Sequence, residues 1–306
     1  MAVLEAHKLG RWYGQVVGLN ELTLTIEGGV TGLIGPNGAG KSTFLKLVAG
    51  EIKPSRGTLR VLGEEPFANR AYFRRVGFCP QQDALYDDMT GPQVVTFLLR
   101  LQGFDRREAR RRAARALERV ALTEGLERPT RGYSKGMRQR VRLAQAIAHD
   151  PELLIVDEPL NGLDPVGRLE MTRLFRELGA AGTHVLISSH VLHEVESLTR
   201  FVALLHHGRL LAQGTVPEIR KLLNRHPRRV EIRLREPRRM ARRLVEFEDV
   251  RSVRLPEDDG PLIVETGDIE RFFERLTPVA AEERAGIRTI ESPDAGLEAV
   301  FDYLVG

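Results

Sequence analysis

Residues 35–43 read Gly-Pro-Asn-Gly-Ala-Gly-Lys-Ser-Thr, and the apolar run Val-Thr-Gly-Leu-Ile at residues 30–34 leads directly into them. A strand, a glycine-rich loop ending in Gly-Lys-Ser and a following helix form a phosphate-binding loop. We expect the helix to cover residues 42–49. A glycine-rich turn that matches by chance is the alternative interpretation, and the flanking strand and helix argue against it. The sequence therefore predicts a nucleoside triphosphate site.

Each position of this loop has a physical task. Gly35, Gly38 and Gly40 let consecutive backbone N–H groups point at phosphate oxygens, and the helix that follows adds its positive end. Lys41 supplies a point charge, and Ser42 supplies a hydroxyl for Mg²⁺. The residues predicted to bind the nucleotide are Gly35, Pro36, Asn37, Gly38, Ala39, Gly40, Lys41, Ser42 and Thr43.

Length and composition set broader limits. At 306 residues the chain has room for one large or two modest domains. No uninterrupted apolar run approaches the ~20 residues of a membrane span. Residues 1–5 lack the basic start and apolar region of a secretion signal, so we expect a cytoplasmic protein. A lone cysteine, Cys79, excludes an internal disulfide, and a net charge of +4 gives no reason to expect nucleic acid as the main partner.

Arginines are concentrated between positions 225 and 243. A solvated face is the simpler interpretation of this cluster. The alternative is a docking surface for anionic headgroups or for an acidic loop of a partner. Its members are Arg225, Arg228, Arg229, Arg233, Arg235, Arg238, Arg239, Arg242 and Arg243.

Hydrophobic periodicity predicts the elements around the loop. Residues 22–26 alternate as a half-exposed antiparallel strand does, and residues 91–150 are helical in character. A helix beginning at Asp105 should bury one narrow face. Apolar runs at 153–156 and 184–187, with a helix at 167–179 between them, have the βαβ rhythm of a parallel sheet. The buried face of the helix after Asp105 consists of Ala109, Ala113, Ala116, Leu117 and Val120.

A change of character near Pro227 predicts a domain boundary. A capping box at residues 215–218 begins a helix that ends near Asn224, so we assign residues 1–224 to the first domain. Beyond it we expect a strand at 230–234, a helix at 239–248, a hairpin of 250–255 with 262–265 around Asp258-Asp259-Gly260, and helices from 269 and at 295–304. This order suits a small α+β domain over residues 228–306, with a ferredoxin-like sheet.

A second chemical motif ends the strand at 153–156, where Asp157 and Glu158 follow four apolar residues. In a doubly wound sheet such residues lie at the carboxyl edge, where the ligand binds. Asp157 is predicted to hold Mg²⁺, and Glu158 to orient or deprotonate the attacking water. Two acidic residues that simply end a strand in solvent are the alternative interpretation.

One further segment distinguishes among the classes of nucleotide-binding protein. It reads Tyr133-Ser134-Lys135-Gly136-Met137 and is followed by a basic helix. It resembles the signature of the ATP-binding cassette (ABC) family, Leu-Ser-Gly-Gly-Gln: Ser134 and Gly136 match, whereas Tyr133, Lys135 and Met137 depart from it. The variant looks like that of ATPase subunits that serve ABC-2 type exporter permeases. The resemblance implies an α/β P-loop NTPase fold of the ABC type. That fold has a RecA-like mixed sheet, an antiparallel β subdomain and a helical subdomain at about 90–150.

Further elements of the family pattern follow in order over about the first 215 residues. Gln81 resembles the glutamine that senses Mg²⁺ and touches the permease, although Gln82 leaves the register open by one. Asp164 closes a segment similar to the D-loop, with Gly162 where alanine is commoner. His190 matches the histidine that meets the γ-phosphate. Tyr13 aligns with the aromatic that stacks on adenine, while the adjacent Trp12 offers the alternative of an aromatic that only packs.

The resemblance also implies how such a chain works. Two cassettes meet head to tail, with ATP and Mg²⁺ between one phosphate loop and the opposite signature, residues 134–137. The partners are a second copy or a paralogous cassette and a separate ABC-2 type permease at the cytoplasmic face of the membrane. A soluble cassette ATPase acting on ribosomes or DNA and a regulatory cassette without transport are the alternatives. The sequence does not identify the transported substrate.

Overall fold

The computed structural model describes residues 2–82, 84–223, 227–256 and 260–293. Its backbone divides into two compact units, residues 1–215 and residues 216–306. The predicted boundary lay a few residues later, because α8 (Val216–Leu223) was placed in the first domain. No helix in the described ranges combines the length and the apolarity needed to cross a bilayer.

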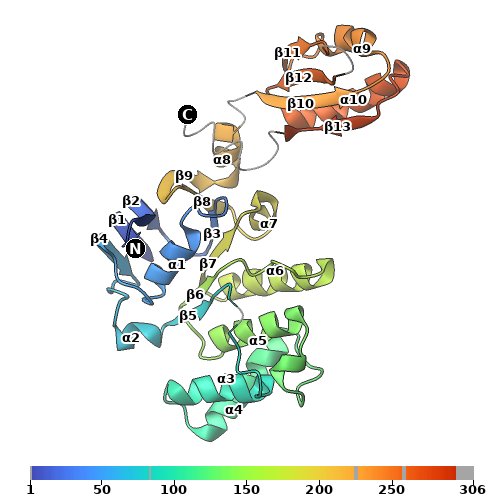
Figure 1. The fold of residues 1–306 in the computed structure, drawn as a ribbon. Coiled ribbons are helices and arrows are strands. Elements are labelled where there is room, and N and C mark those ends of the chain that lie inside the picture. Colours follow the sequence, from blue (N-terminus) through green and yellow to red (C-terminus); the bar gives the residue numbers. More distant parts are fainter. Residues whose placement is uncertain (1, 83, 224–226, 257–259, 294–306) are drawn as a thin grey trace. The chain divides into compact units, whose positions relative to one another are not determined.

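A six-stranded sheet forms the centre of the first unit (Figure 1). Its strands β5, β6, β7, β3 and β8 run parallel, and β9 closes the sheet as an antiparallel hairpin with β8. Their order confirms the predicted βαβ rhythm. In spatial order the strands are β5 (Val76–Cys79), β6 (Leu153–Val156), β7 (His184–Ser189), β3 (Val30–Ile34), β8 (Phe201–His206) and β9 (Arg209–Thr215).

Both faces of this sheet are covered, which explains why its strands are apolar runs. In β6, Leu153 and Ile155 point to one core, and Leu154 and Val156 point to the other. The first core also contains α1 (Lys41–Val48) and an antiparallel sheet; the second contains α5 (Lys135–Ile147) and α6 (Pro165–Ala180). The antiparallel sheet has the order β2 (Val16–Ile26), β1 (Leu4–Tyr13) and β4 (Arg56–Val61).

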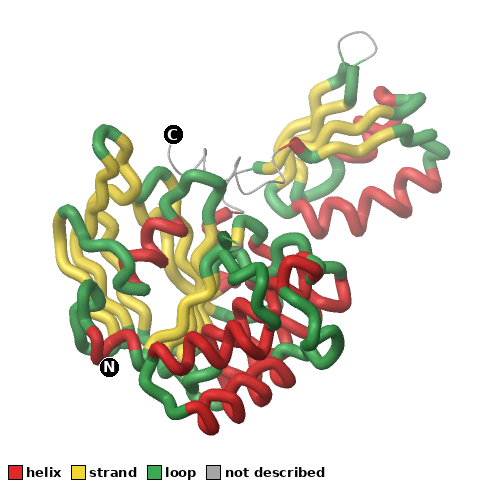
Figure 2. The backbone as a smooth tube through the Cα atoms, turned by 60° about the horizontal axis from the view of Figure 1, so that its bottom comes forward, coloured by secondary structure: helices red, strands yellow, loops and turns green. Residues whose placement is uncertain are grey.

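Three helices, α3 (Gly91–Leu101), α4 (Arg106–Arg119) and α5, pack together in the region predicted to be helical (Figure 2). Each begins at a capping side chain: Thr90, Asp105 and Ser134 accept hydrogen bonds from backbone N–H groups of their first turns. The predicted face of α4 is buried. Shorter elements are α2 (Arg70–Phe73), a 3₁₀ turn (Thr130–Gly132) and α7 (Leu192–Glu196).

Helix α5 lies very close to the edge strand of the central sheet. A Cβ added to Gly77 in β5 would lie 2.0 Å from the carbonyl oxygen of Ala146 in α5. Only glycine leaves room for that approach. This contact fixes the helix that begins at Ser134 against the strand that ends at Cys79.

The second unit contains a four-stranded antiparallel sheet in the order β11, β12, β10, β13. Its chain order after α8 is β-α-β-β-α-β, the order of ferredoxin-like domains. The buried side chains include Val230, Ile232, Leu262 and Val264 from the sheet. The elements are β10 (Arg228–Arg233), α9 (Pro237–Leu244), β11 (Val250–Arg254), β12 (Leu262–Thr266), α10 (Ile269–Glu282) and β13 (Thr289–Glu291).

Some predictions for this unit need correction. The helix predicted at 239–248 ends at Leu244, because Phe247 leaves the helix through a turn and packs edge-on against Phe272. Strand β13 was not predicted, since its three residues are all exposed and carry no apolar alternation. Asp258, Asp259 and the helix predicted at 295–304 lie outside the described residues.

Part of the arginine cluster is paired within its own unit. Arg243 lies 3.2 Å from Glu283 of the turn after α10, and Arg239 contacts the same carboxylate. Such pairs at a surface contribute about 0–1 kcal/mol. These two residues therefore fit the solvated-face interpretation, and Arg225 lies outside the described residues.

Candidate nucleotide site

Three loops meet at the carboxyl edge of the central sheet because β6, β7 and β3 are neighbours there. Residues 35–40 follow β3, the acidic pair Asp157-Glu158 follows β6, and His190 follows β7. The amide of Gly35 donates to the carbonyl of Ser189 over 3.3 Å, which joins the first loop to the third. The sheet thus brings together motifs separated by more than a hundred residues.

The loop after β3 requires glycine at defined positions. A Cβ on Gly35 would lie 2.3 Å from the carbonyl oxygen of Leu205 in β8. Gly40 has a φ of 98°, and its Cβ would lie 2.6 Å from the carbonyl oxygen of Gly18. Helix α1 starts directly after it without a side-chain cap. Its first N–H groups and its positive end are therefore directed at the loop, as an anion site needs.

Lys41 is a buried cation at the centre of this loop. Its side chain is 6% exposed, and its Nζ donates to the carbonyls of Gly35 over 2.6 Å and Pro36 over 3.1 Å. The same ammonium lies 3.4 Å from a carboxylate oxygen of Glu158. The ammonium group of the phosphate loop and the acidic group of β6 are therefore in direct contact.

Glu158 also contacts the histidine that follows β7. His190 Nδ1 lies 2.9 Å from Glu158 Oε2. The carboxylate side chain is 7% exposed, whereas the imidazole is 39% exposed. Glu158 is thus held between a buried ammonium group and a histidine that reaches solvent.

Ser188 joins the two acidic residues, although sequence reasoning gave it no role. Its hydroxyl donates to Asp157 Oδ1 over 2.5 Å and accepts from the amide of Glu158 over 2.8 Å. Glu158 has a φ of 50°, a left-handed conformation that is uncommon for a residue with a side chain. The bond from its amide to Ser188 helps to hold that conformation. The signal was present, since Ser188 directly precedes the Ser-His pair at the end of an apolar strand.

The oxygen groups near this edge fit a magnesium ion that arrives with a nucleotide. Mg²⁺ is bound by one or two protein oxygens, with phosphate oxygens and water completing its shell. Ser42 in the first turn of α1 and Asp157 at the end of β6 are oxygen donors of this kind. Among the described residues no group of three His, Cys, Asp or Glu side chains forms a metal cluster.

Tyr13 and Trp12 point to different places. A Cβ on Gly18 would lie 3.0 Å from the Tyr13 ring and 3.0 Å from Thr43, so the exposed ring of Tyr13 lies near the start of α1. The indole of Trp12 instead covers Gly10, where a Cβ would approach it to 2.7 Å. Of the two aromatics, Tyr13 is the one beside the phosphate loop.

The structure does not bring the Gln81 side chain into contact with Lys41 or Asp157 in the described part of the chain. Gln81 and Gln82 are both exposed. Their backbone carbonyls, rather than their side chains, are held by Arg142. The expected role of Gln81 at a metal ion therefore requires its side chain to turn inward.

The signature residues line a different pocket, together with the D-loop. Ser134, Lys135, Gly136 and Met137 share it with Gly162 and Asp164, and no phosphate-loop residue is among its lining. The side chain of Lys135 passes over Gly162, where a Cβ would lie 2.3 Å from Nζ. Lys135 in the signature and Gly162 in the D-loop both depart from the family pattern. The two departures are linked, because glycine at position 162 leaves the space that the lysine side chain occupies. Asp164 caps α6 by accepting from the amide of Gly167 over 2.8 Å.

A phosphate loop after β3, facing two carboxylates after β6, defines a P-loop nucleotide-binding protein. Comparison with known proteins gives the family. The family model described as "ABC transporter" matches residues 19–161. The daunorubicin/doxorubicin resistance ATP-binding protein DrrA of Streptomyces peucetius is 32% identical over 99% of this chain and 92% of its own length. The chain belongs to the ABC transporter family, and its relatives are ATP-binding proteins of that family.

Other comparisons agree. An uncharacterized ABC transporter ATP-binding protein of Nostoc is 40% identical over 70% of this chain and 65% of that protein, so the match spans about two thirds of the relative. A solved ATP-binding subunit of an ABC transporter is 31% identical and superposes with a TM-score of 0.65, covering 72% of this chain and 92% of that subunit. The predicted fold class and family are confirmed.

Proposed function

We propose that this chain hydrolyses ATP as the cytoplasmic subunit of an ABC-2 type exporter. Two cassettes would close head to tail around two ATP molecules and drive a separate membrane permease. The observation that carries the proposal is the contact of Lys41, Glu158 and His190 at one sheet edge. A cassette without hydrolysis would not need a buried carboxylate held between these two groups.

Each residue has a role in this proposal. The amides of residues 35–43 and Lys41 bind the β- and γ-phosphates, and Tyr13 stacks on the base. Ser42 and Asp157 would hold Mg²⁺, which would neutralise charge on the phosphates, and Gln81 would reach it from the segment after β5. Glu158 orients and deprotonates the attacking water, and His190 binds the γ-phosphate.

The second pocket explains why two chains are needed. Ser134 at the start of α5 offers a hydroxyl and a helix N-terminus, and the pocket that it lines does not include Lys41. A second cassette turned end to end would place these groups on the far side of the γ-phosphate. ATP then holds the two chains together, and its cleavage releases them.

Export is the direction supported by the relatives. DrrA is named for resistance to daunorubicin and doxorubicin, and it matches this chain over nearly its full length. We place the protein at the cytoplasmic face of the membrane, bound through its permease. We further propose that residues 228–306 help to hold two cassettes together between cycles, because this region carries a separate fold with its own core.

Mixing two inactive variants tests the head-to-tail arrangement. Lys41→Met removes one phosphate ligand, and Ser134→Glu places a carboxylate where the partner's γ-phosphate would bind. Mixed dimers then contain one intact site formed by Lys41 of one chain and Ser134 of the other. We expect the equimolar mixture to recover about a quarter of wild-type phosphate release, assuming random pairing and independent sites.

Each variant alone is the control for this mixture and should stay inactive at any protein concentration. No recovery on mixing would contradict the two-chain site. Activity of Ser134→Glu by itself at the wild-type level would show that the signature does not contribute to hydrolysis.

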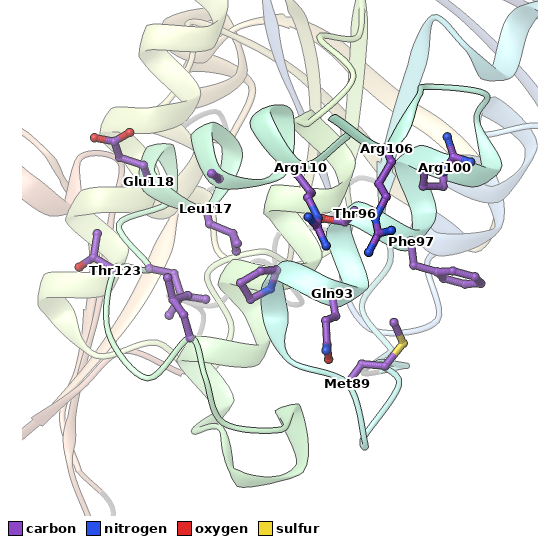
Figure 3. Close-up of a pocket in the computed structure, with 14 residues that line it drawn as sticks. Met89, Gln93, Thr96, Phe97, Arg100, Arg106, Arg110, Leu117, Glu118 and Thr123 are labelled. Carbon is purple, nitrogen blue, oxygen red and sulfur yellow. The ribbon is translucent and has the colours of Figure 1, made fainter. Parts of the chain in front are cut away.

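A groove on the helical region is the proposed docking site for the permease (Figure 3). It has a volume of about 900 Å³ and runs between α3, α4 and the segment at residues 122–126. Arg106 and Arg110 extend from α4 toward α3, and the apolar residues Phe97 and Leu117 also line the groove. An amphipathic cytoplasmic segment of the permease with acidic side chains would complement these groups.

Charge reversal in the groove should separate docking from hydrolysis. We expect Arg106→Glu with Arg110→Glu to leave phosphate release by the isolated chain within about twofold of wild type, since both are surface residues. The same variant should lose at least about tenfold in retention on membranes that contain the co-expressed permease. Arg107→Glu, on another face of α4, is the control. Equal retention of both variants would exclude the groove as the docking site.

A further inference from the structure

Helix α5 carries a buried arginine to which the mechanism proposed above gives no role. Arg142 is 7% exposed. No carboxylate of the described residues forms a salt bridge with it, and its Nε has no hydrogen-bond partner in the same part of the chain. An unpaired buried cation is costly unless neutral oxygens surround it. The oxygen atoms around Arg142 therefore indicate its role.

The guanidinium group holds the backbone that follows β5. Its Nη1 lies 3.0 Å from the carbonyl oxygen of Pro80, 2.8 Å from that of Gln81 and 2.6 Å from that of Gln82. Its Nη2 donates to the side-chain oxygen of Gln139, one turn earlier in α5. A planar fork lets one nitrogen face the carbonyls while the other bonds Gln139, which the single nitrogen of a lysine ammonium cannot do.

The other side of the same segment is attached to the acidic strand. The amide of Asp157 donates to the carbonyl of Cys79 over 3.0 Å, directly before Pro80. The segment at residues 79–82 therefore lies between the end of β6 and helix α5. The segment is hydrogen-bonded to the end of β6 through Asp157 and to helix α5 through Arg142.

Helix α5 is also the helix of the signature. It begins at Lys135, with Ser134 as its cap, and Arg142 follows two turns later, about 12 Å along the axis. A helix with intact hydrogen bonds moves as a rigid rod over this length. A displacement of Ser134 is therefore transmitted to the carbonyls that Arg142 holds.

We propose that Arg142 is a positioning residue that ties the Gln81 segment to the signature helix, so that Gln81 reaches its inward position only when Ser134 is placed against a partner's nucleotide. This inference rests on the proposed function, since it assigns Gln81 to the magnesium ion. Arg142 would then connect two parts of one chain. The first is the Gln81 segment, which serves the nucleotide bound by the same chain, and the second is Ser134, which contacts the nucleotide bound by the partner.

The only cysteine of the sequence is a direct probe of this link. Cys79 is fully buried beside the segment, and Gln139 Nε2 lies 4.0 Å from its sulfur. Burial raises the pKa of the Cys79 thiol to about 12, so at neutral pH the protonated thiol reacts slowly with disulfide reagents. Labelling of Cys79 by a thiol reagent therefore measures how often residues 79–82 come away from α5.

The test compares Arg142→Met with wild type in two measurements. Without nucleotide, we expect Cys79 labelling to accelerate about tenfold or more, because three carbonyls lose a charged donor. In hydrolysis assays, we expect the free Mg²⁺ concentration for half-maximal phosphate release to rise about tenfold. In a Gln81→Ala background the Arg142→Met substitution should leave that concentration unchanged, since the residue that it positions is gone.

Arg112→Met is the matched control. Arg112 ties α4 to Asp150, three residues after the end of α5, and stacks on Phe104, so its loss lowers stability without touching residues 79–82. We expect wild-type labelling and a wild-type Mg²⁺ midpoint. Arg142→Lys should recover the labelling rate only in part, because a single ammonium nitrogen cannot face the three carbonyls and the side-chain oxygen of Gln139 at the same time.

Two outcomes would overturn the inference. An Arg142→Met chain that labels no faster than wild type would show that the segment is held without Arg142. A lower maximal rate with an unchanged Mg²⁺ midpoint would show a structural role only. If wild type hydrolyses no ATP at any Mg²⁺ concentration, the proposed function fails, and labelling alone then decides whether Arg142 holds the segment.

Discussion

The Glu158→Gln variant should hydrolyse ATP at least about a hundredfold more slowly than wild type while it still binds ATP. Glutamine has nearly the same shape as glutamate, yet it cannot accept the proton of the attacking water. The surroundings of Glu158 are otherwise kept, since Lys41 can donate to the amide oxygen and His190 Nδ1, in the tautomer that leaves it free to accept, can bond the amide N–H. We therefore expect the variant to accumulate as an ATP-bound dimer.

Phosphate release gives the rate, and light scattering with and without ATP gives the mass of the particle. Glu152→Gln is the matched control, because Glu152 lies just before the same strand but pairs with Arg75 at the surface. That pair lowers the pKa of Glu152 and contributes at most about 1 kcal/mol to stability. A Glu158→Gln chain that hydrolyses ATP at the wild-type rate would show that Glu158 is not the base of the reaction.

The Lys41→Met variant should lose ATP affinity by about tenfold or more, and its residual hydrolysis by about a hundredfold or more. Methionine keeps the length of the side chain and removes the charge that faces the phosphates. The substitution also leaves Glu158 buried without its nearest cation, 3.4 Å away. We therefore expect a lower midpoint of thermal unfolding in the absence of nucleotide.

Equilibrium binding of a fluorescent ATP analogue measures this affinity. Lys46→Met is the control, because Lys46 lies in the same helix α1 outside the contacts of Lys41 and Glu158. It should bind ATP as wild type does. Equal affinities of the Lys41 and Lys46 variants would contradict the assignment of residues 35–43 as the phosphate loop.

The candidate site residues stand out in the sequence because each lies in a local pattern. Residues 35–43 indicate a phosphate loop, because the glycine spacing, the preceding strand and the following helix can all be recognised in the local sequence. The same holds for Asp157 and Glu158 at the end of a short apolar run. Helix α4 was predicted with its buried face because Asp105 caps it and its apolar residues recur at helical spacing.

Short or exposed elements could not be predicted. Strand β13 has no alternation to detect, and α9 ends at Leu244, after which Phe247 packs against Phe272, a residue distant in the chain. Ser188 lies in a motif that the sequence shows, but its partners Asp157 and Glu158, like the carbonyls that Arg142 holds, lie 30 or more positions away in the chain. Long-range contacts leave no local pattern.

The sequence by itself determined the fold class, the family and the candidate site residues, because loops and helix starts need particular residues at fixed spacing. Only the tertiary structure decided which of these residues lie in contact with one another. Adjacent parallel strands bring Lys41, Glu158 and His190 into contact, and the packing of α5 on β5 lets Arg142 hold the Gln81 backbone. Such contacts depend on the order of strands in a sheet and on the approach of a helix, which are set by burial of the whole core.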